Sequence, residues 1–475
     1  MPEPPLKVDS MNYFDDFGRF GNAPALILED GNTLTFLQLE SAADSVGKYL
    51  AHRGLVFLLA ENRPEAVAGY LACLRARAPA ALFSATLHAS FLAELLRVYS
   101  PSYVWLPRER AAEIPNAVTM FALGEYALLA TGSPQVAVDD TLALLVTTSG
   151  STGSPKLVRL SYGNLAANAE SISAYLQIES GDRAITSLPM NYVYGLSVIN
   201  SHLLRGASIL LTDAGLTEQR FWELMKTHHA TSLSGVPYTY EMLKRLRFRR
   251  MELPNLRTLT QAGGKLHADL VREFAAISQE KGIRFYVMYG AAEATARMSY
   301  LPPEQALAKP GSIGRAIPGG QFWLQDGNGH VIEDSGVAGE LYYRGPNVSL
   351  GYASCQDDLA RGDERDGVLA TGDVAQRDES DMYSIVGRRS RFLKLFGNRV
   401  NLEEIEQMVR NTGTDCACHG DDSQLRIYIT ERARRDAVLS AVEELTRLHR
   451  SALSVIVMDH IPRSTSGKIL YAELS

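Results

Sequence analysis

Between about Leu128 and Gly290, short apolar runs alternate with longer amphipathic stretches, and this alternation restricts the fold more than any other feature. It predicts a mostly parallel sheet covered by helices, because parallel neighbours need a crossover connection between them. The predicted helices include Leu216–His228 and His267–Lys281, the second ended by Gly282. The predicted strands are Ala143–Thr147, Ala184–Leu188, Ser208–Leu211, Thr258–Gln261 and Phe285–Tyr289.

The rest of the chain predicts further domains, since 475 residues are too many for one ordinary core. Nearer the N-terminus the alternation is less clear, with a buried strand at Val56–Ala60 and a helix at Pro64–Ala76. Beyond Pro310, short strands and glycine-rich turns predict a small β-rich subdomain over residues 310–388.

A smaller α/β unit is predicted at the C-terminal end of the chain. The pattern Asn401-Leu402-Glu403-Glu404 is typical of a capping box and opens a helix that ends near Gly413. We place the domain boundary at Arg389–Ser390, which gives domains of residues 1–388 and 389–475. The elements predicted after the first helix are the strands Leu425–Thr430 and Val455–Met458 and the helix Asp436–Leu448.

Residues 144–158 run from an apolar strand directly into a loop of small hydroxyl residues, two glycines and one lysine. Gly150 and Gly153 have no Cβ, so the backbone can turn tightly and present its N–H groups outward. The hydroxyl groups and the Lys156 ammonium add further donors for an anion. We interpret the segment as a polyphosphate-binding loop, with an ordinary surface loop as the alternative.

A series of short motifs continues from this loop towards the C-terminus. In chain order they are Thr148-Ser149-Gly150-Ser151-Thr152-Gly153-Ser154-Pro155-Lys156, Tyr289-Gly290-Ala291-Ala292-Glu293, Gly339-Glu340-Leu341, Thr371-Gly372-Asp373, Gly387-Arg388 and Pro462-Arg463-Ser464-Thr465-Ser466-Gly467-Lys468. The ordered series resembles the adenylate-forming superfamily, which comprises acyl-CoA synthetases, adenylation domains of peptide synthetases and firefly luciferase. The resemblance covers the chain from about Thr147 to Lys468.

The resemblance implies an ATP site formed by several of these motifs. Tyr289 would lie against the adenine, and Asp373 and Arg388 would approach the ribose and phosphates. Glu293 matches the family's magnesium-linked carboxylate, because a hard oxygen ligand suits a Mg²⁺ ion that bridges phosphates. The other residues implied to bind the nucleotide are Thr148, Ser149, Gly150, Ser151, Thr152, Gly153, Lys156, Gly263, Gly264, Gly290, Ala291 and Ala292.

The implied reaction joins a carboxylate to AMP with release of pyrophosphate, and a thiol then attacks the acyl-adenylate to give a thioester. Lys468 matches the family's catalytic lysine, and cations aimed at the reacting phosphorus supply most of such catalysis. In the family, a mobile α+β C-terminal lid then rotates and brings the loop equivalent to Phe396-Gly397-Asn398 to the thiol channel. The thiol would belong to CoA or to the phosphopantetheine arm of an acyl or peptidyl carrier protein.

The acid substrate is expected to bind near residues 187–195. Tyr192 stands where acyl-CoA synthetases often carry a histidine. Amino-acid-activating enzymes use an aspartate here, and none lies between Leu188 and Ser197. Because burying an ammonium without a counter-charge is costly, we favour an uncharged acyl or aryl acid. The candidate contacts are Asn191, Tyr192, Tyr194 and Gly195.

Composition restricts the partners and the compartment. A net charge of −7 indicates no nucleic-acid surface, and we interpret the basic run Lys244–Arg250 as a solvated helix face, with CoA phosphate or carrier-protein contact as the alternative. No membrane span or signal peptide is predicted. Four cysteines favour a reducing cytoplasm, and Cys416 and Cys418 are interpreted as incidental surface residues.

Some positions depart from the family pattern, which keeps other functions open. Ala292 stands where a threonine hydroxyl usually meets a phosphate, Ser390 and Arg391 occupy the hinge segment, and Tyr471 replaces a common basic residue. The alternatives are a degenerate homologue that binds nucleotide or acyl chain without turnover, an amino-acid-activating enzyme, and a luciferase-like oxygenase. Retention of the predicted charged residues argues against the degenerate homologue.

Overall fold

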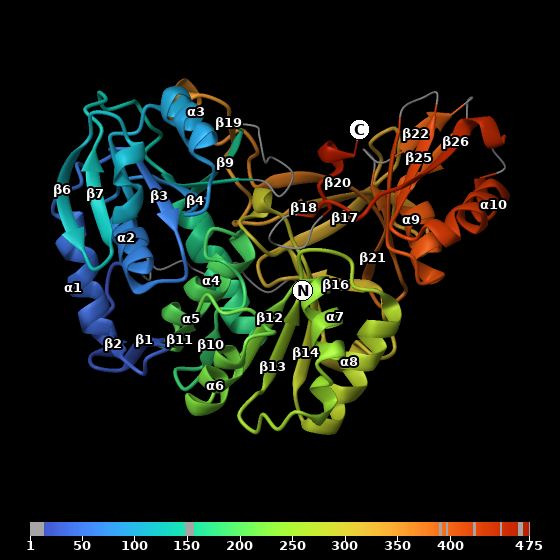
Figure 1. Cartoon of the computed structure of the whole chain (residues 1–475), viewed down its shortest axis with the longest axis horizontal. Helices are drawn as coiled ribbons and strands as arrows, with labels where there is room; N and C mark the ends of the chain where they lie inside the picture. Colours follow the sequence, from blue (N-terminus) through green and yellow to red (C-terminus); the bar gives the residue numbers. More distant parts are fainter. Residues whose placement is uncertain are drawn as a thin grey trace. The chain divides into compact units, whose positions relative to one another are not determined.

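The computed structural model describes residues 14–147, 156–388, 392–395, 398–420, 424–446, 449–463 and 469–474 (Figure 1). The chain divides into two compact units. The first comprises Met1–Gln321 and Tyr343–Leu369, and the second comprises Phe322–Tyr342 and Ala370–Ser475. The boundary predicted at Arg389–Ser390 lies outside the described residues and stays a prediction.

One sheet of the first unit runs in the order β16-β15-β14-β13-β12-β10-β11-β1-β2. Its strands from β1 through β14 pair in parallel, whereas β2, β15 and β16 are antiparallel to their neighbours. The bounds are β1 Pro24–Leu28, β2 Thr33–Thr35, β10 Arg183–Ile185, β11 Ser208–Leu211, β12 Ser232–Gly235, β13 Thr258–Gln261, β14 Arg284–Tyr289, β15 Ser299–Leu301 and β16 Ser312–Ala316.

The other sheet of this unit has eight strands in the order β19-β9-β8-β4-β3-β5-β7-β6. The β8, β4, β3 and β5 strands pair in parallel, and β9 returns antiparallel to β8. The bounds are β3 Val56–Ala60, β4 Ala80–Ser84, β5 Tyr103–Pro107, β6 Val118–Leu123, β7 Tyr126–Ala130, β8 Leu142–Thr147, β9 Leu157–Ser161 and β19 Gly351–Ala353.

Helices cover the sheets, and large buried apolar clusters lie between the two kinds of element. Local sequence sets the helix ends: the Ser161 side chain caps α4, and α8 ends at Gly282, whose φ of +67° suits a residue without Cβ. Figure 1 shows α7 and α8 beside β13 and β14. The bounds are α1 Phe36–Gly47, α2 Pro64–Arg75, α3 Ala89–Tyr99, α4 Tyr162–Leu176, α5 Val193–Leu204, α6 Gln219–Thr227, α7 Pro237–Arg245 and α8 Ala268–Lys281.

The second unit is richer in short strands. One group runs in the order β17-β18-β20-β21, and a three-stranded sheet β24-β25-β26 carries helices α9 and α10. The bounds are β17 Gln321–Gln325, β18 Ala338–Arg344, β20 Val368–Arg377, β21 Tyr383–Arg388, β22 Phe392–Leu395, β23 Asn398–Asn401, α9 Leu402–Asn411, β24 Cys416–Gly420, β25 Leu425–Ile429, α10 Arg435–Thr446 and β26 Leu453–Val457.

The predicted α/β class is confirmed, with differences in detail. The sheets are parallel only in their centres, since the edge strands return through hairpins. The strand predicted at Ala184–Leu188 is shorter, because residues after Ile185 leave the sheet as a loop. Cys416 and Cys418 lie in the core of the second unit, so their interpretation as surface residues was wrong. No helix in the described ranges meets the length and hydrophobicity needed to cross a bilayer.

Candidate active site

Several predicted site residues of the first unit follow neighbouring parallel strands. Ala262–Gly264 follow β13, Tyr289 ends β14, and the segment containing Asn191 and Tyr192 follows β10. These strands pair in parallel through β12, so their carboxyl ends lie at one edge of the sheet. The carboxyl edge of such a sheet is where α/β folds bind ligands.

Lys156 and Glu293 are linked through a residue that the motifs did not single out. The Lys156 ammonium lies 3.6 Å from the centroid of the Tyr352 ring. The Tyr352 hydroxyl donates a 2.8 Å hydrogen bond to Glu293 Oε1, and the Arg365 guanidinium lies over the same ring at 4.8 Å. Tyr352 therefore joins the predicted phosphate cation to the predicted magnesium carboxylate. Residues 148–153 of the predicted loop lie outside the described residues.

The fit of Glu293 to a magnesium ion depends on its surroundings. The side chain is half-buried, and Tyr352 orients one carboxylate oxygen. Among the described residues, no group of three or more histidine, cysteine or acidic side chains is arranged to hold a metal. A single carboxylate still fits Mg²⁺, because that ion commonly takes one or two carboxylates and completes its shell with phosphate oxygens and water.

The segment after Tyr289 folds back on itself tightly. A Cβ at Gly290 would lie 1.8 Å from the carbonyl oxygen of Ala296, so only glycine fits there. Ala291 is half-buried and Ala292 is buried at the start of a short 3₁₀ turn. The backbone therefore holds Glu293 in a fixed position, whereas Ala292 supplies no side-chain hydrogen bond.

The glycines after β13 permit a close approach of Tyr192. Gly263 has a φ of +82°, and a Cβ there would lie 2.6 Å from the Tyr192 hydroxyl oxygen. Gln261 braces the turn because its Nε2 donates to the carbonyl oxygen of Gly264 at 2.8 Å. The structure thus brings together one predicted adenine-wall residue and one predicted acid contact.

The other predicted acid contacts differ in accessibility. Asn191 is half-buried, whereas Tyr194 is buried and its hydroxyl donates to the carbonyl oxygen of Thr260 at 2.9 Å. Gly195 lies in the first turn of α5 next to the Pro189 carbonyl oxygen, which would lie 2.3 Å from a Cβ. Tyr194 and Gly195 therefore hold the segment against the sheet.

Asp373 and Arg388 form an ion pair in the second unit. They stand opposite each other on β20 and β21, and Arg388 Nε lies 2.6 Å from Asp373 Oδ1. The Asp373 side chain is 5% exposed, whereas that of Arg388 is 53% exposed. Thr371 lies two residues before Asp373 on β20, and its hydroxyl donates to the Leu341 carbonyl oxygen at 2.8 Å. A carboxylate held this way has a fixed orientation.

Tyr471, which follows the C-terminal motif in the sequence, contacts a buried carboxylate. The predicted catalytic Lys468 lies outside the described residues, as do Ser390, Arg391, Phe396 and Gly397. Three residues after Lys468, the Tyr471 hydroxyl donates to Glu406 Oε2 at 3.1 Å. Glu406 also pairs with Arg410 and accepts from the backbone N–H of Cys418. Tyr471 is therefore anchored by its hydrogen bond to Glu406. A basic residue at this position would instead form a second ion pair with Glu406, beside the one with Arg410.

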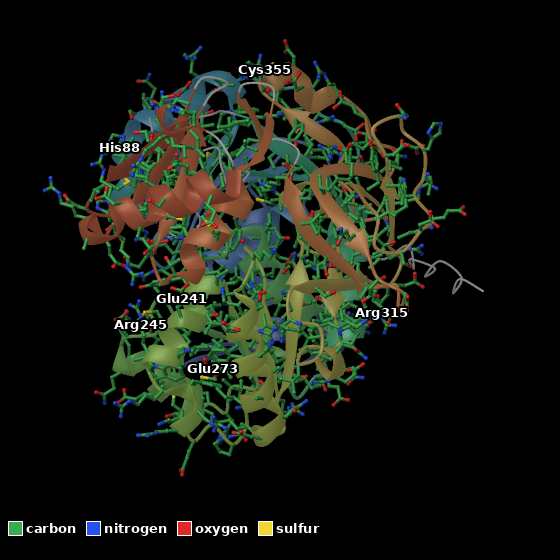
Figure 2. All side chains as sticks on the ribbon, turned by 90° about the vertical axis from the view of Figure 1, so that its right-hand side faces the viewer. His88, Glu241, Arg245, Glu273, Arg315 and Cys355 are labelled. Carbon is green, nitrogen blue, oxygen red and sulfur yellow. The ribbon has the colours of Figure 1, made fainter. Side chains whose placement is uncertain are left out.

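The basic run on and after α7 is paired with acidic side chains of α8. Lys244 Nζ lies 2.6 Å from Glu273, and Arg249 pairs with Glu280. Figure 2 shows Glu241, Arg245 and Glu273 on this side of the first unit. These exposed pairs agree with the interpretation of a solvated helix face.

Sequence reasoning missed Tyr352 and a buried arginine, Arg297. Tyr352 lies on an edge strand outside every motif, and Arg297 lies four residues after Glu293 in an apolar context. An isolated arginine among apolar residues was the one available signal for Arg297. The Tyr352 contact depends on the antiparallel pairing of β19 with β9, which no local pattern predicts.

A family model described as "AMP-binding enzyme" matches residues 14–353. Among curated proteins, the chain is 27% identical to an indoleacetate–CoA ligase of Aromatoleum aromaticum, over 91% of this chain and 89% of that protein. It is 27% identical to an oxalate–CoA ligase of Arabidopsis thaliana, covering 87% and 86%. It is 26% identical to a 2-succinylbenzoate–CoA ligase of Bacillus cereus, covering 93% of each.

Solved structures share the fold along the whole chain. The o-succinylbenzoate CoA synthetase MenE of Bacillus subtilis, in complex with the acyl-adenylate intermediate OSB-AMP, superposes with a TM-score of 0.79. The two chains are 22% identical, over 100% of this chain and 98% of that one. ATP-bound MatB of Rhodopseudomonas palustris has a TM-score of 0.78 at 22% identity, with 98% of each chain covered.

Proposed function

The chain belongs to the AMP-binding enzyme family, whose model matches most of its length, and on this premise we propose that it is an AMP-forming acid–CoA ligase. The resemblance to the adenylate-forming superfamily is thereby confirmed. In the reaction, a carboxylate oxygen attacks the α-phosphorus of ATP and displaces pyrophosphate. A thiol then attacks the acyl carbon, which forms a thioester and releases AMP.

The observation that carries the proposal is the chain of contacts from Lys156 through Tyr352 to Glu293. A cation and a carboxylate held on one aromatic side chain match the two needs of a magnesium–triphosphate, which are charge neutralisation and a hard oxygen ligand. Magnesium, when bound, would reduce repulsion between the incoming carboxylate and the phosphates. Lys156 and the loop before it would orient the phosphates.

The remaining roles divide between the two units. In the first, Tyr289, Gly263 and Gly264 would accept the adenine, and Tyr192 and Asn191 would contact the acid. In the second, Asp373 would accept hydrogen bonds from the ribose hydroxyls, with Arg388 holding its carboxylate in place. Lys468 would contact the reacting carboxylate and phosphate during the first half-reaction.

We take CoA as the thiol because the curated relatives named above are CoA ligases. The phosphopantetheine arm of a carrier protein presents the same thiol and is the second candidate acceptor. The relatives' names span aromatic acids and dicarboxylic acids, so they leave the acid substrate open. A luciferase-like oxygenase shares the first half-reaction, and oxygen consumption would identify it.

The test is a hydroxamate-trapping screen with ATP and Mg²⁺ over aliphatic, aromatic, dicarboxylic and amino acids. We expect acid-dependent hydroxamate and pyrophosphate with a restricted group of acids, and a thioester when CoA replaces hydroxylamine. Thioester formation only with a phosphopantetheinylated carrier protein would move the assignment to a carrier-protein ligase. Nucleotide binding without pyrophosphate release from any acid would contradict the proposal and indicate a degenerate homologue.

A further inference from the structure

Three arginines of the first unit are buried, namely Arg53, Arg159 and Arg297, and among the described residues only Arg297 has no acidic partner. Arg159 pairs with Glu364 Oε2 at 2.6 Å and donates to the carbonyl oxygen of Tyr352. Arg297 is 2% exposed, and no carboxylate in the described part of the chain lies within ion-pair distance of it. Its Nε has no hydrogen-bond partner there either. Arg159 is a satisfied structural cation, whereas Arg297 is an uncompensated one.

The groups around Arg297 are uncharged. Its Nη1 donates to the Tyr175 hydroxyl at 3.1 Å and lies 3.0 Å from Met288 Sδ, and its guanidinium lies over the Tyr194 ring at 4.7 Å. Burial raises the pKa of Tyr175 to about 12, so this phenol stays neutral. An arginine keeps its proton and its charge even when it is buried. The cation–π contact with Tyr194 offsets only part of the free-energy cost of removing that charge from water. An anionic group of a ligand would supply the missing partner.

The backbone before Arg297 is fixed in a strained conformation. Thr295 has a φ of +64°, and the N–H of Ala296 donates to the carbonyl oxygen of Ala294 at 2.7 Å, which makes a γ-turn rare for a β-branched residue. The Thr295 hydroxyl and the Asn168 amide hold the turn on both sides, and Asn168 Nδ2 donates to the Arg297 carbonyl oxygen.

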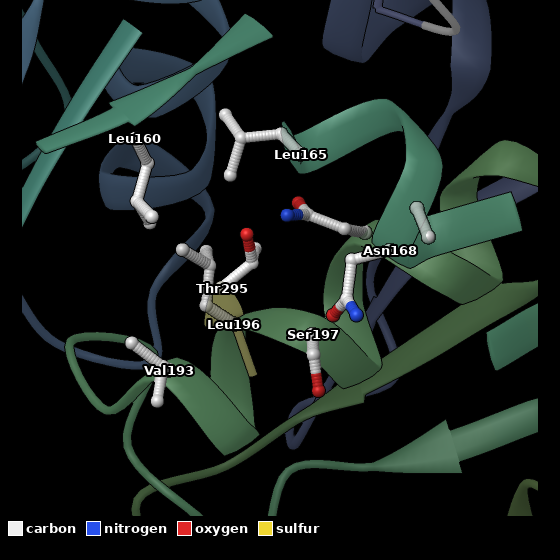
Figure 3. A pocket seen from close by; sticks show the side chains of 9 residues that line it. Leu160, Leu165, Asn168, Val193, Leu196, Ser197 and Thr295 are labelled. Atoms are coloured by element: carbon white, nitrogen blue, oxygen red, sulfur yellow. The ribbon is translucent and has the colours of Figure 1, made fainter. Parts of the chain in front are cut away.

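Figure 3 shows Thr295 and Asn168 lining a small cavity beside this turn. The cavity has a volume of about 10 Å³, which is room for about one water molecule. Such a cavity is too small for an anionic ligand and can hydrate only the polar groups that line it. The strained turn and the bond from Asn168 fix the backbone at Arg297.

Arg297 lies at the inner end of the segment predicted to bind the acid. The Tyr194 ring below its guanidinium is 6.2 Å from the Tyr192 ring, centroid to centroid. Tyr192 is half-buried, and its hydroxyl lies against Gly263 at the carboxyl edge of the sheet. Tyr194 therefore connects the guanidinium of Arg297 with a side chain that is predicted to contact the acid.

We propose that Arg297 is a specificity-determining residue that binds a second anionic group of the acid, so that the substrate is a dicarboxylic acid or an acid with an equivalent anionic substituent. The inference rests on the proposed function. One carboxylate attacks ATP, and the other stays ionised against the guanidinium. The proposal replaces the expectation of an acid without a second charged group. It also excludes an amino acid whose ammonium lies next to Arg297, because two buried cations would repel each other.

The test compares acids of equal carbon number: butanoate with butanedioate, hexanoate with hexanedioate, and methylphenylacetate with carboxyphenylacetate. Acid-dependent pyrophosphate release is measured for the wild type, Arg297→Met and Arg315→Met. Arg315 is the matched control, since it is an exposed arginine that also lies over a tyrosine ring (Figure 2). We expect kcat/KM of the wild type to favour one dicarboxylate by about tenfold or more, Arg297→Met to lose that advantage, and Arg315→Met to keep it.

The inference would be overturned if pyrophosphate is released but kcat/KM is equal or higher for the monoacid in every pair. The proposed function would then still stand. Retention of the dicarboxylate advantage in Arg297→Met would have the same two consequences. If no acid releases pyrophosphate, the proposed function fails. The Arg297 site is then tested separately by thermal unfolding with each dicarboxylate. A dicarboxylate must raise the melting temperature of the wild type and must not raise that of Arg297→Met. If Arg297→Met does not fold, Arg297→Lys, which lacks the planar fork, must show a reduced advantage.

Discussion

The ammonium of Lys156 lies over the face of the Tyr352 ring, 3.6 Å from its centroid. The same ring carries the hydroxyl that donates to Glu293, so one side chain holds two groups that the sequence places 137 positions apart. An aromatic face attracts the cation without neutralising its charge. Tyr352 is thus a positioning residue for the proposed nucleotide site.

Tyr352→Phe should separate the two contacts of this residue. The ring remains for Lys156, whereas Glu293 loses its hydrogen bond, which should lower the free energy of unfolding by about 1 kcal/mol. We expect the KM for magnesium–ATP, measured by pyrophosphate release, to be higher in Tyr352→Phe than in the wild type. In Tyr352→Ala, which also loses the ring under Lys156, we expect a larger increase in this KM. Tyr49→Phe, at an exposed tyrosine stacked on Phe121, is the control. An unchanged magnesium dependence in Tyr352→Phe would exclude the positioning role.

Asp373→Asn tests whether the buried carboxylate of the second unit binds the ribose. The substitution keeps the shape and removes the charge that pairs with Arg388. We expect the KM for ATP to rise by about tenfold or more, with a smaller rise in Arg388→Lys, because an ammonium can still pair with Asp373. The comparison with 2′-deoxy-ATP provides the check: the wild type should discriminate against it more than Asp373→Asn does. Equal discrimination by both would place Asp373 in the fold alone.

Stability should depend on pH through His202, which is buried in α5. Burial lowers its pKa to about 4 from the ordinary 6.5. Between these values the unfolded chain binds the proton and the folded chain does not, so the contribution is fully present above pH 6.5 and is lost as the pH falls towards 4. The loss should be on the order of 3 kcal/mol. Urea unfolding of the wild type and His202→Gln at pH 7.5 and 5 should show a steeper fall for the wild type, and parallel falls would refute the assignment.

The sequence predicted elements where apolar periodicity was continuous. Val56–Ala60, Ser208–Leu211 and Thr258–Gln261 are strands with the predicted bounds, because each is buried and consists mostly of apolar or β-branched residues. The strand Ser232–Gly235 was missed, since two serines and a glycine carry little strand signal and its place depends on pairing between β10 and β13. Tertiary pairing decides such segments.

For the site, motifs predicted the residues that share a local pattern, and pairing supplied the others. Glu293 and Asp373 were predicted because each ends a short motif. Tyr352 reaches Glu293 only through the register of β19 against β9, and Arg297 becomes informative only when its lack of an acidic partner is known. The spacing of apolar residues along the sequence predicts neither the contact of Tyr352 with Glu293 nor the missing acidic partner of Arg297.

The most direct test of the account follows the two half-reactions separately in Lys468→Ala, with the acid identified by the hydroxamate screen. Adenylation is measured by acid-dependent ATP–pyrophosphate exchange, and thiol transfer by CoA thioester formation from the synthetic acyl-adenylate. We predict that the variant loses exchange and keeps thioester formation, because the lysine acts on the phosphate and carboxylate and not on the thiol. Equal loss of both half-reactions, or unimpaired exchange, would contradict the account.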